Sequence, residues 1–190
     1  MQGSQDDLIL IDKIIEGEES LFRDLVEKHK KYVYTIALKI LRNEEDAEEA
    51  AKDAFVKAFG ALKKFNREAK FTTWLYRIVF NTAITYQRKR KEGVENIDNT
   101  RLKETLMDHS KDELEFADKK LYVNKAINSL NPTDATIITL FYLKELSLYE
   151  ISDVTSLKVN AIKVKLFRSR KRLADELHKL LNVETDSIVG

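Results

Sequence analysis

The stretch from Ser147 to Leu173 reads SLYEISDVTSLKVNAIKVKLFRSRKRL, and it decides the class of fold that we expect. Its first four residues fit a capping box, in which Ser147 and Glu150 each bond to the other's backbone and open a short helix. A few residues, TSLKV, separate this helix from a last one that starts near Asn160. A short helix, a tight turn and a longer basic helix are the outline of a helix-turn-helix.

The last helix has two faces of different chemistry. Apolar and small side chains recur along it at spacings of three or four residues, which is the pattern of a core-facing stripe. The stripe consists of Ile162, Leu166, Ser169, Leu173, Leu177 and Leu180. Between Lys158 and Arg172 there are seven basic residues and no acidic one, with Phe167 among them on the opposite face.

A solvated basic face would explain these charges but not the phenylalanine. A helix in the DNA major groove uses cations for guanine and phosphate and an apolar group for thymine methyls. We therefore predict that this face binds duplex DNA, with the following contacts: Lys163, Val164, Phe167, Arg168 and Lys171.

The stretch from Phe71 to Lys91, FTTWLYRIVFNTAITYQRKRK, predicts a second helix with a face for nucleic acid. One face is apolar and holds Leu75, Ile78, Thr82 and Tyr86; the neighbouring face holds Trp74, Arg77, Asn81, Thr85 and Arg88. Rings, cations and one amide suit single-stranded nucleic acid, although an ordinary core tryptophan with a solubilising basic end is the simpler alternative. Opening about ten base pairs costs on the order of 14 kcal/mol, and stacking returns only about 1–3 kcal/mol per base, so melting would need a larger partner.

The stretch from Asn43 to Phe65, NEEDAEEAAKDAFVKAFGALKKF, predicts a helix that starts after an Asn43 N-cap and runs to about Leu62. Acidic residues lie on the face away from its apolar side at spacings of three and four; they are Asp46, Glu49 and Asp53, with Val56 alongside. Capping and solvation explain the acids of the first turn, but Asp53 lies too far inside the helix to gain from the dipole. This face could dock a basic partner helix.

Composition limits the remaining possibilities. The chain has 190 residues, of which 43% are hydrophobic and 34% charged, with one proline, five glycines, no cysteine and a formal net charge of +1. So few turn residues favour long helices, and the near-neutral balance means that attraction to phosphate must come from local clusters. The absence of cysteine excludes disulfides and thiolate metal sites, and no apolar run is long enough to span a bilayer. We expect a soluble, intracellular, all-helical protein with no enzymatic site, no metal and no cofactor.

We expect two small helical domains joined by a flexible linker. The predicted N-terminal domain covers residues 1–91, the polar linker 92–112, the C-terminal helix-turn-helix domain 113–182 and a short tail 183–190. In the C-terminal domain, Asn131 should be an N-cap with Pro132 at the first helical position. About 20 flexible residues span roughly 25 Å, which would let two modules reach separate DNA elements.

Taken in order, DAEEAAKDAFVKAFGALKKF, FTTWLYRIVFN and the helix-turn-helix stretch resemble bacterial RNA polymerase sigma factors of the extracytoplasmic-function (ECF) type, in the sigma-70 family. The resemblance covers about Leu8 to Leu181. It implies a non-enzymatic cytoplasmic protein that binds core RNA polymerase (beta and beta-prime subunits) and promoter DNA. It also implies an anti-sigma factor, often membrane-bound in this family, as a further partner.

The resemblance also implies roles for individual residues. The surface on the polymerase clamp would comprise Asp46, Glu49, Lys52, Asp53 and Val56. Single-stranded minus-ten DNA would meet Phe65, Asn66, Arg67, Lys70, Phe71, Trp74, Arg77, Asn81, Arg88 and Lys89. The minus-thirty-five element would be read as duplex by the five residues already assigned to the last helix.

Four positions depart from the pattern of the family. Lys52 stands where glutamine is frequent, and Thr85 where aspartate is usual. Ser156 replaces the turn glycine, and Lys158 replaces a small or capping residue before the last helix. These departures bear on polymerase contact, local packing and promoter specificity rather than on the fold.

Two other functions remain open from the residues alone. A stand-alone helix-turn-helix regulator would dimerise and hold duplex DNA without polymerase. A helical interaction scaffold would carry the same basic faces merely as solvated surface.

Overall fold

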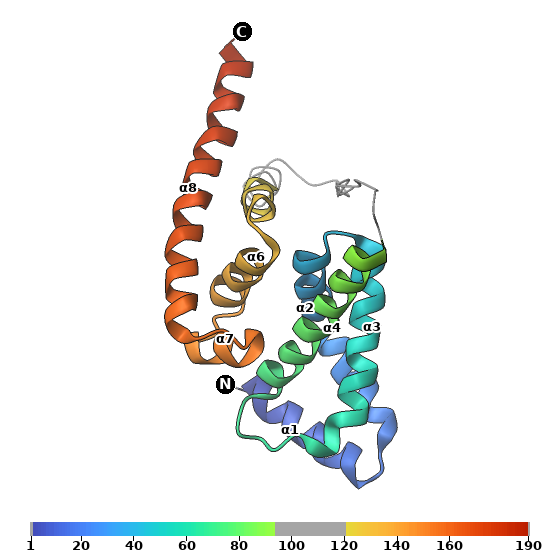
Figure 1. Cartoon of the computed structure of the whole chain (residues 1–190). Helices are drawn as coiled ribbons and strands as arrows, with labels where there is room; N and C mark the ends of the chain where they lie inside the picture. Colours follow the sequence, from blue (N-terminus) through green and yellow to red (C-terminus); the bar gives the residue numbers. More distant parts are fainter. Residues whose placement is uncertain (1, 94–120, 190) are drawn as a thin grey trace.

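The computed structural model describes residues 2–93 and 121–189 of the chain, and every element within them is helical (Figure 1). The first part holds the helices α1 (Gln2–Glu16), α2 (Phe22–Leu41), α3 (Glu44–Ala61) and α4 (Phe71–Gly93), with single 3-10 turns η1 (Glu19–Leu21) and η2 (Leu62–Lys64). The second part holds a helix over residues 121–129, then α6 (Pro132–Ile138), the π-helical turn η3 (Thr139–Leu143), α7 (Leu148–Thr155) and α8 (Val159–Val189). The predicted all-α class with two helical domains is confirmed.

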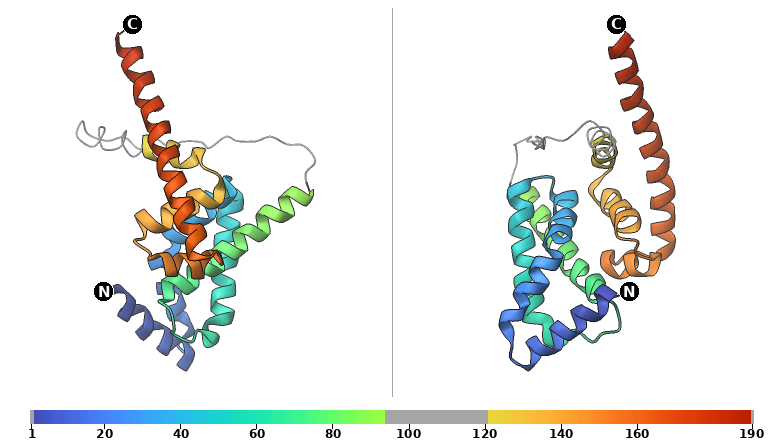
Figure 2. Two further views of the ribbon diagram at one scale, coloured as in Figure 1. Left: turned by 60° about the vertical axis from the view of Figure 1, so that its left-hand side comes forward. Right: turned by 180° about the vertical axis from the view of Figure 1, so that it is seen from behind.

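The N-terminal domain is a bundle in which α2, α3 and α4 pack against one another, with α1 across one end (Figures 1 and 2). Helix α3 begins as predicted, because the Asn43 side chain accepts a hydrogen bond from the Asp46 backbone N–H at 2.9 Å. Small side chains on its buried face allow close approach; they are Ala47, Ala50, Ala51, Ala54 and Ala58. Helix α2 ends at Arg42, whose left-handed φ of 55° turns the chain toward α3.

Helix α1 is absent from our sequence prediction. It packs on the bundle through Ile11 and Ile14, and it brings Asp7 against α2, where Asp7 is 1% exposed. The Asp7 carboxylate lies 2.7 Å from the Lys28 ammonium and 3.1 Å from Nε2 of His29. The spacing of Leu8, Ile11 and the apolar residues after it is helical, so periodicity alone could have found α1.

The C-terminal domain contains the predicted helix-turn-helix. Ser147 and Glu150 form the reciprocal capping box that opens α7, and Asn131 caps α6 with Pro132 at its first position. Helix α7 ends at Ser156, which has a left-handed φ of 60° at the position where the family resemblance expects glycine. The π-helical turn η3 was not predicted, because nothing in its sequence distinguishes it from an α-helix.

The two domains lie side by side, with α4 against α7 and α2 against α6 (Figures 1 and 2). Most of the predicted linker, 92–112, and the predicted domain start at 113 lie outside the described residues. Of the linker, residues 92–93 belong to the last turn of α4. The predicted tail, 183–190, continues α8 as far as Val189, and this end of α8 projects away from the body (Figure 1).

Candidate nucleic-acid and protein interfaces

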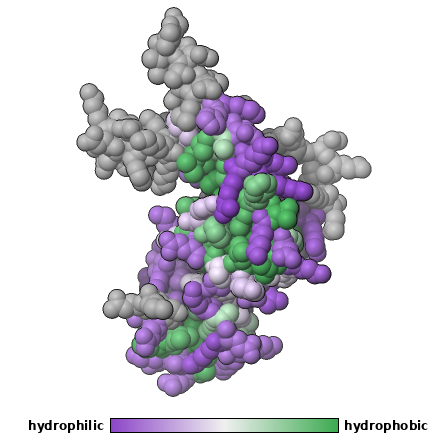
Figure 3. Space-filling model, turned by 90° about the vertical axis from the view of Figure 1, so that its left-hand side faces the viewer, coloured by the Kyte–Doolittle hydropathy of each residue, from purple (hydrophilic) through white to green (hydrophobic). Residues whose placement is uncertain are grey.

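Helix α8 exposes the face that we predicted to bind duplex DNA. Phe167 is 70% exposed, and Val164 lies exposed one turn before it. The cations Lys163, Arg168 and Lys171 on the same part of the helix are also exposed. Viewed from the α8 side, the molecule shows hydrophobic areas set among hydrophilic side chains (Figure 3). An exposed ring flanked by cations is the combination that a major-groove helix uses.

The opposite side of α8 anchors the helix as its periodicity predicts. Ile162, Leu166 and Ser169 are buried, and the stripe then becomes half-buried over Leu173, Leu177 and Leu180. Two other cations of α8 bond within their own domain. Lys165 forms a 2.8 Å ion pair with Asp134, and Arg170 donates to the Tyr142 hydroxyl at 2.5 Å. The geometry therefore separates the basic residues that hold α8 in place from those that face outward.

Helix α4 presents a mixed aromatic and polar face. Arg77, Asn81, Arg88 and Lys89 are exposed, as is Thr85, while Trp74 is half-buried. Leu75 and Thr82 on the neighbouring face are buried. The two faces thus differ in burial as their sequence pattern predicts.

Phe65 and Phe71 do not share this exposure, with 6% and 2% of their surfaces accessible. Their ring centroids lie 5.3 Å and 5.7 Å from that of Trp74. The two phenylalanines are large apolar groups next to a bundle core, so they fill it rather than face solvent. In this structure they support Trp74, which is the ring of the three that reaches the surface.

The polar residues between these phenylalanines lie in an exposed loop. Asn66 accepts a 3.3 Å hydrogen bond from the Glu68 backbone, and Arg67, with a left-handed φ of 62°, pairs with Asp12 of α1. Lys70 forms a 2.9 Å ion pair with Glu150 of α7 in the other domain. The loop is thus bonded to two other parts of the molecule, α1 through Arg67 and α7 through Lys70.

On α3, the predicted acidic face divides into two parts. Asp46 lies 3.2 Å from the Arg90 guanidinium, and Asp53 accepts a 2.8 Å hydrogen bond from the Tyr86 hydroxyl, so both help to hold α4. Glu49, Lys52 and Val56 are exposed, with Val56 71% accessible. These three form the outward surface of α3.

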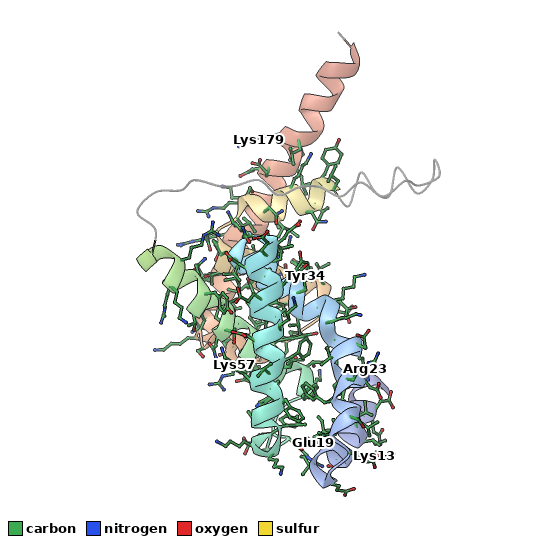
Figure 4. The ribbon with its side chains drawn as sticks, turned by 90° about the vertical axis from the view of Figure 1, so that its right-hand side faces the viewer. Lys13, Glu19, Arg23, Tyr34, Lys57 and Lys179 are labelled. Atoms are coloured by element: carbon green, nitrogen blue, oxygen red, sulfur yellow. The ribbon has the colours of Figure 1, made fainter. Side chains whose placement is uncertain are left out.

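Sequence reasoning missed an apolar groove between α2 and α3. Its floor is made by Val26, Tyr34, Ala51 and Phe55, and its rim by Lys30, Lys31, Glu48 and Lys52. Figure 4 shows Tyr34 on α2 beside α3, and Lys57 on the other side of α3. The groove adjoins the outward surface of α3 through Lys52. Apolar residues that line a groove have the same periodicity as core residues, so no sequence signal separated them.

Within residues 2–93 and 121–189, no group of three or more histidine, aspartate or glutamate side chains is placed to hold a metal ion. None of the helices in the same ranges is long and apolar enough to cross a membrane.

Comparison with known proteins finds two domain models of one family. Sigma-70 region 2 matches residues 25–92, and Sigma-70, region 4 matches residues 120–173. The "ECF RNA polymerase sigma factor SigW" of Bacillus subtilis (strain 168) is 29% identical over 182 residues, which is 90% of this chain and 96% of that protein. The "RNA polymerase sigma-H factor" of Pseudomonas aeruginosa is 26% identical over 190 residues, which is 95% of this chain and 98% of that protein.

Two solved structures share the fold. CnrH, solved in complex with the cytosolic domain of CnrY, superposes with a TM-score of 0.63 at 24% identity over 90% of this chain and 96% of its own. The sigma factor RpoE, solved with the anti-sigma factor NepR from Bartonella quintana, gives a TM-score of 0.66 at 20% identity over 83% of this chain and 96% of its own. In both cases the likeness extends over the two helical domains.

Proposed function

This chain belongs to the sigma-70 family of RNA polymerase sigma factors, of the ECF type, and so directs promoter-specific transcription initiation; from that premise we propose which of its surfaces bind polymerase and which bind promoter DNA. Helix α3 docks on core polymerase, α4 captures the minus-ten element as single strand, and α8 reads the minus-thirty-five element as duplex. The main support for this assignment is that the chain exposes two faces suited to different forms of nucleic acid. One lies on α4 in the N-terminal domain and the other on α8 in the C-terminal domain.

For the minus-ten element, the support is the polar face of α4. Trp74 offers a partly exposed ring for stacking, the Asn81 amide can bond to a base edge, and Arg77 and Arg88 can meet phosphates. Phe65 and Phe71 enter this proposal as the buried support of Trp74. Asn66, Arg67, Lys70 and Lys89 would supply further polar and charged contacts to the strand.

For the minus-thirty-five element, the support is the exposure of Phe167 and Val164 between cations. Lys163 and Arg168 can bond to guanine or to phosphates, and the apolar groups can meet thymine methyls. The first helix of the motif, α7, would then cross the DNA backbone.

For polymerase, the support is the outward surface of α3 together with the apolar groove beside it. An exposed valine and an apolar floor with a charged rim have the composition of a protein interface, whose centre is apolar and whose rim is polar. Asp46 and Asp53 would act mainly by positioning α4 under this surface, because both are already bonded to side chains of α4. We place the protein in the cytoplasm with core polymerase, under the control of an anti-sigma factor like that of the solved RpoE.

The test is co-migration of the purified protein with the core RNA polymerase of its host on size exclusion, without DNA. We expect a stable one-to-one complex that then binds promoter DNA. If the protein ignored polymerase but shifted duplex DNA as a dimer, it would be a stand-alone helix-turn-helix regulator and the proposal would fail.

A further inference from the structure

Lys144 lies just after η3, at a pocket lined by α2, α4 and the turn before α7. Its side chain is half-buried, and its ammonium lies over the ring of Tyr32 on α2. Within residues 2–93 and 121–189, Lys144 forms no ion pair with a carboxylate. Lys165 of α8 is also half-buried, but it pairs with Asp134 at 2.8 Å. Lys144 therefore has a ring as its partner where other half-buried lysines have an acid.

The charged groups around the Lys144 amine are mainly cationic. The titratable side chains that line the pocket or act on Lys144 are the following: Lys28, His29, Lys31 and Tyr32 of α2, Tyr76 of α4, and Glu145 next to it in the chain. Lys28 and His29 share the buried carboxylate of Asp7, and Glu145 is exposed. The surroundings thus provide little to balance the charge of Lys144.

These surroundings favour the uncharged form of the amine. Burial, followed by the charge of Lys31, lowers the pKa of Lys144 from 10.5 to about 8. The Tyr32 ring attracts the ammonium only weakly at a half-exposed site, so it offsets a small part of this effect. At neutral pH the amine of Lys144 is therefore uncharged, and able to act as a nucleophile, in a much larger share of molecules than an ordinary lysine amine.

We propose that Lys144 is a modification site, a nucleophilic lysine that small acyl phosphates acylate in the pocket beside it. The proposal goes beyond promoter recognition and does not depend on it. A desolvated lysine next to a second cation is one of the ways in which proteins activate an amine. The pocket has a volume of about 320 Å³, at the lower end for ligand sites, so it suits a small donor. Lys28 and Lys144 on its wall favour an anionic donor, which an acyl phosphate is.

The reaction is an acyl transfer. The uncharged nitrogen of Lys144 attacks the carbonyl carbon of the donor, so that a C–N bond forms and the C–O bond to phosphate breaks. Phosphate leaves with the electron pair of that bond, and water accepts the proton that the nitrogen loses. The product is a neutral amide, so acylation removes the charge of Lys144 and its contact with the Tyr32 ring. This change occurs just before Ser147, which caps α7 and opens the helix-turn-helix.

The site can be tested by incubating the full-length protein with acetyl phosphate and measuring acetylation of each lysine by mass spectrometry. At pH 7.5 an amine with a pKa of about 8 is uncharged in about a quarter of molecules, against about a thousandth at a pKa of 10.5. A less basic amine is a weaker nucleophile, which offsets part of this gain. We therefore expect Lys144 to react about tenfold faster than Lys13, which is exposed on α1.

The dependence of these rates on pH gives a second reading. The rate at Lys144 should level off above about pH 8, while the rate at Lys13 keeps rising. Equal rates at the two lysines between about pH 7 and 9 would overturn the proposal.

Two variants of α2 test whether the surroundings cause the reactivity. Lys31→Glu replaces the like charge near Lys144 by a carboxylate, which favours the ammonium, and should slow acetylation of Lys144 by roughly fivefold. The matched control is Lys30→Glu, which makes the same change at the preceding position, where the lysine pairs with Glu27. It should leave the rate at Lys144 unchanged, and circular dichroism shows that both variants are folded. Wild-type rates at Lys144 in both folded variants, or equal slowing in both, would refute the role of the pocket.

Discussion

Asp53 on α3 accepts a hydrogen bond from the hydroxyl group of Tyr86 on α4, with 2.8 Å between the two oxygen atoms. The bond connects the helix proposed to dock on polymerase with the helix proposed to bind single-stranded DNA. Burial, and then this hydrogen bond, raise the pKa of Tyr86 to about 12. A phenol donates this bond only while it is protonated, so the contact between the helices depends on the proton.

Replacing Tyr86 by phenylalanine should lower the free energy of unfolding by about 1 kcal/mol, because Asp53 loses a donor. The folded-state pKa of Tyr86 lies above its ordinary value of 10.0, so the stabilising effect is complete below that pH and is lost as the pH rises through about 12. Urea unfolding of both proteins across this range should show the difference between them shrinking with pH.

The control for this measurement is Tyr149→Phe, since Tyr149 is 75% exposed. It should leave the free energy of unfolding unchanged at every pH. A pH-independent difference between wild type and Tyr86→Phe would show that the lost hydrogen bond is not the cause.

A second prediction concerns acid. Burial alone would raise the pKa of Asp7, but hydrogen bonds from His29 and Lys28 outweigh it, and the pKa is lowered from 3.8. The paired carboxylate therefore stabilises the protein above that pH, and this contribution is lost as the pH falls through the lower folded-state value. Asp7→Asn should reduce the free energy of unfolding at neutral pH. It should also make this free energy fall less steeply as the pH is lowered into the acid range, which is the acid limb of the stability curve. Denaturant unfolding at several pH values measures both effects, and an acid limb of unchanged steepness would contradict the prediction.

A third prediction concerns the turn of the helix-turn-helix. Ser156 holds a left-handed φ of 60°, a conformation that costs residues with a Cβ about 1–2 kcal/mol and glycine almost nothing. Replacing Ser156 by glycine removes this strain, but the greater freedom of glycine in the unfolded chain offsets part of the benefit. Ser156→Gly should therefore raise the free energy of unfolding by about 0.5–1 kcal/mol. The comparison is Ala161→Gly at an exposed position inside α8, which should cost about 1 kcal/mol. Thermal melts give both changes, and a stability loss in both variants would refute the role assigned to Ser156.

The helix ends and the core faces followed from local rules and were predictable. Asn43, Asn131 and Ser147 are caps with short-range signals, and the stripe of α8 follows from a spacing of three or four residues. The exposure of Phe167 followed from the same spacing, because the opposite side of that helix had to be the buried one.

What the sequence could not provide are contacts between residues that are distant along the chain. Asp53 looked available for docking because no local group explained it, whereas its partner lies 33 positions away. Phe65 lies just after η2 and Phe71 is the first residue of α4, so neither lies inside a helix where periodicity would predict its burial. The packing of one domain on the other likewise depends on long-range pairs such as Lys39 with Asn128, which no local pattern encodes.

A fourth prediction separates the two DNA-binding surfaces. Phe167→Ala and Lys163→Ala should each weaken recognition of the minus-thirty-five element by roughly tenfold, corresponding to about 1–3 kcal/mol per lost base contact. Both side chains are exposed, so folding should be unaffected. Fluorescence anisotropy with duplex carrying the element, in the presence of polymerase, gives the affinity. A fall in polymerase affinity instead would mean that this face of α8 belongs to the protein interface.

The last prediction tests docking on α3 without disturbing α4. Asp53→Lys is a poor choice, because it also breaks the bond to Tyr86 and so changes folding and docking together. Glu49 is exposed on the same helix, and Glu49→Lys should weaken the complex with core polymerase several-fold by placing a cation against a basic partner surface.

Asp153→Lys makes the same change of charge at an exposed position of α7, outside the proposed docking surface, and should leave polymerase affinity unchanged. Titration of core polymerase with labelled protein at low and high salt measures both, and the loss in Glu49→Lys should shrink as salt screens the repulsion. Equal affinities for the two variants and the wild type would remove the outward surface of α3 from the interface and leave the apolar groove between α2 and α3 as the place to look next.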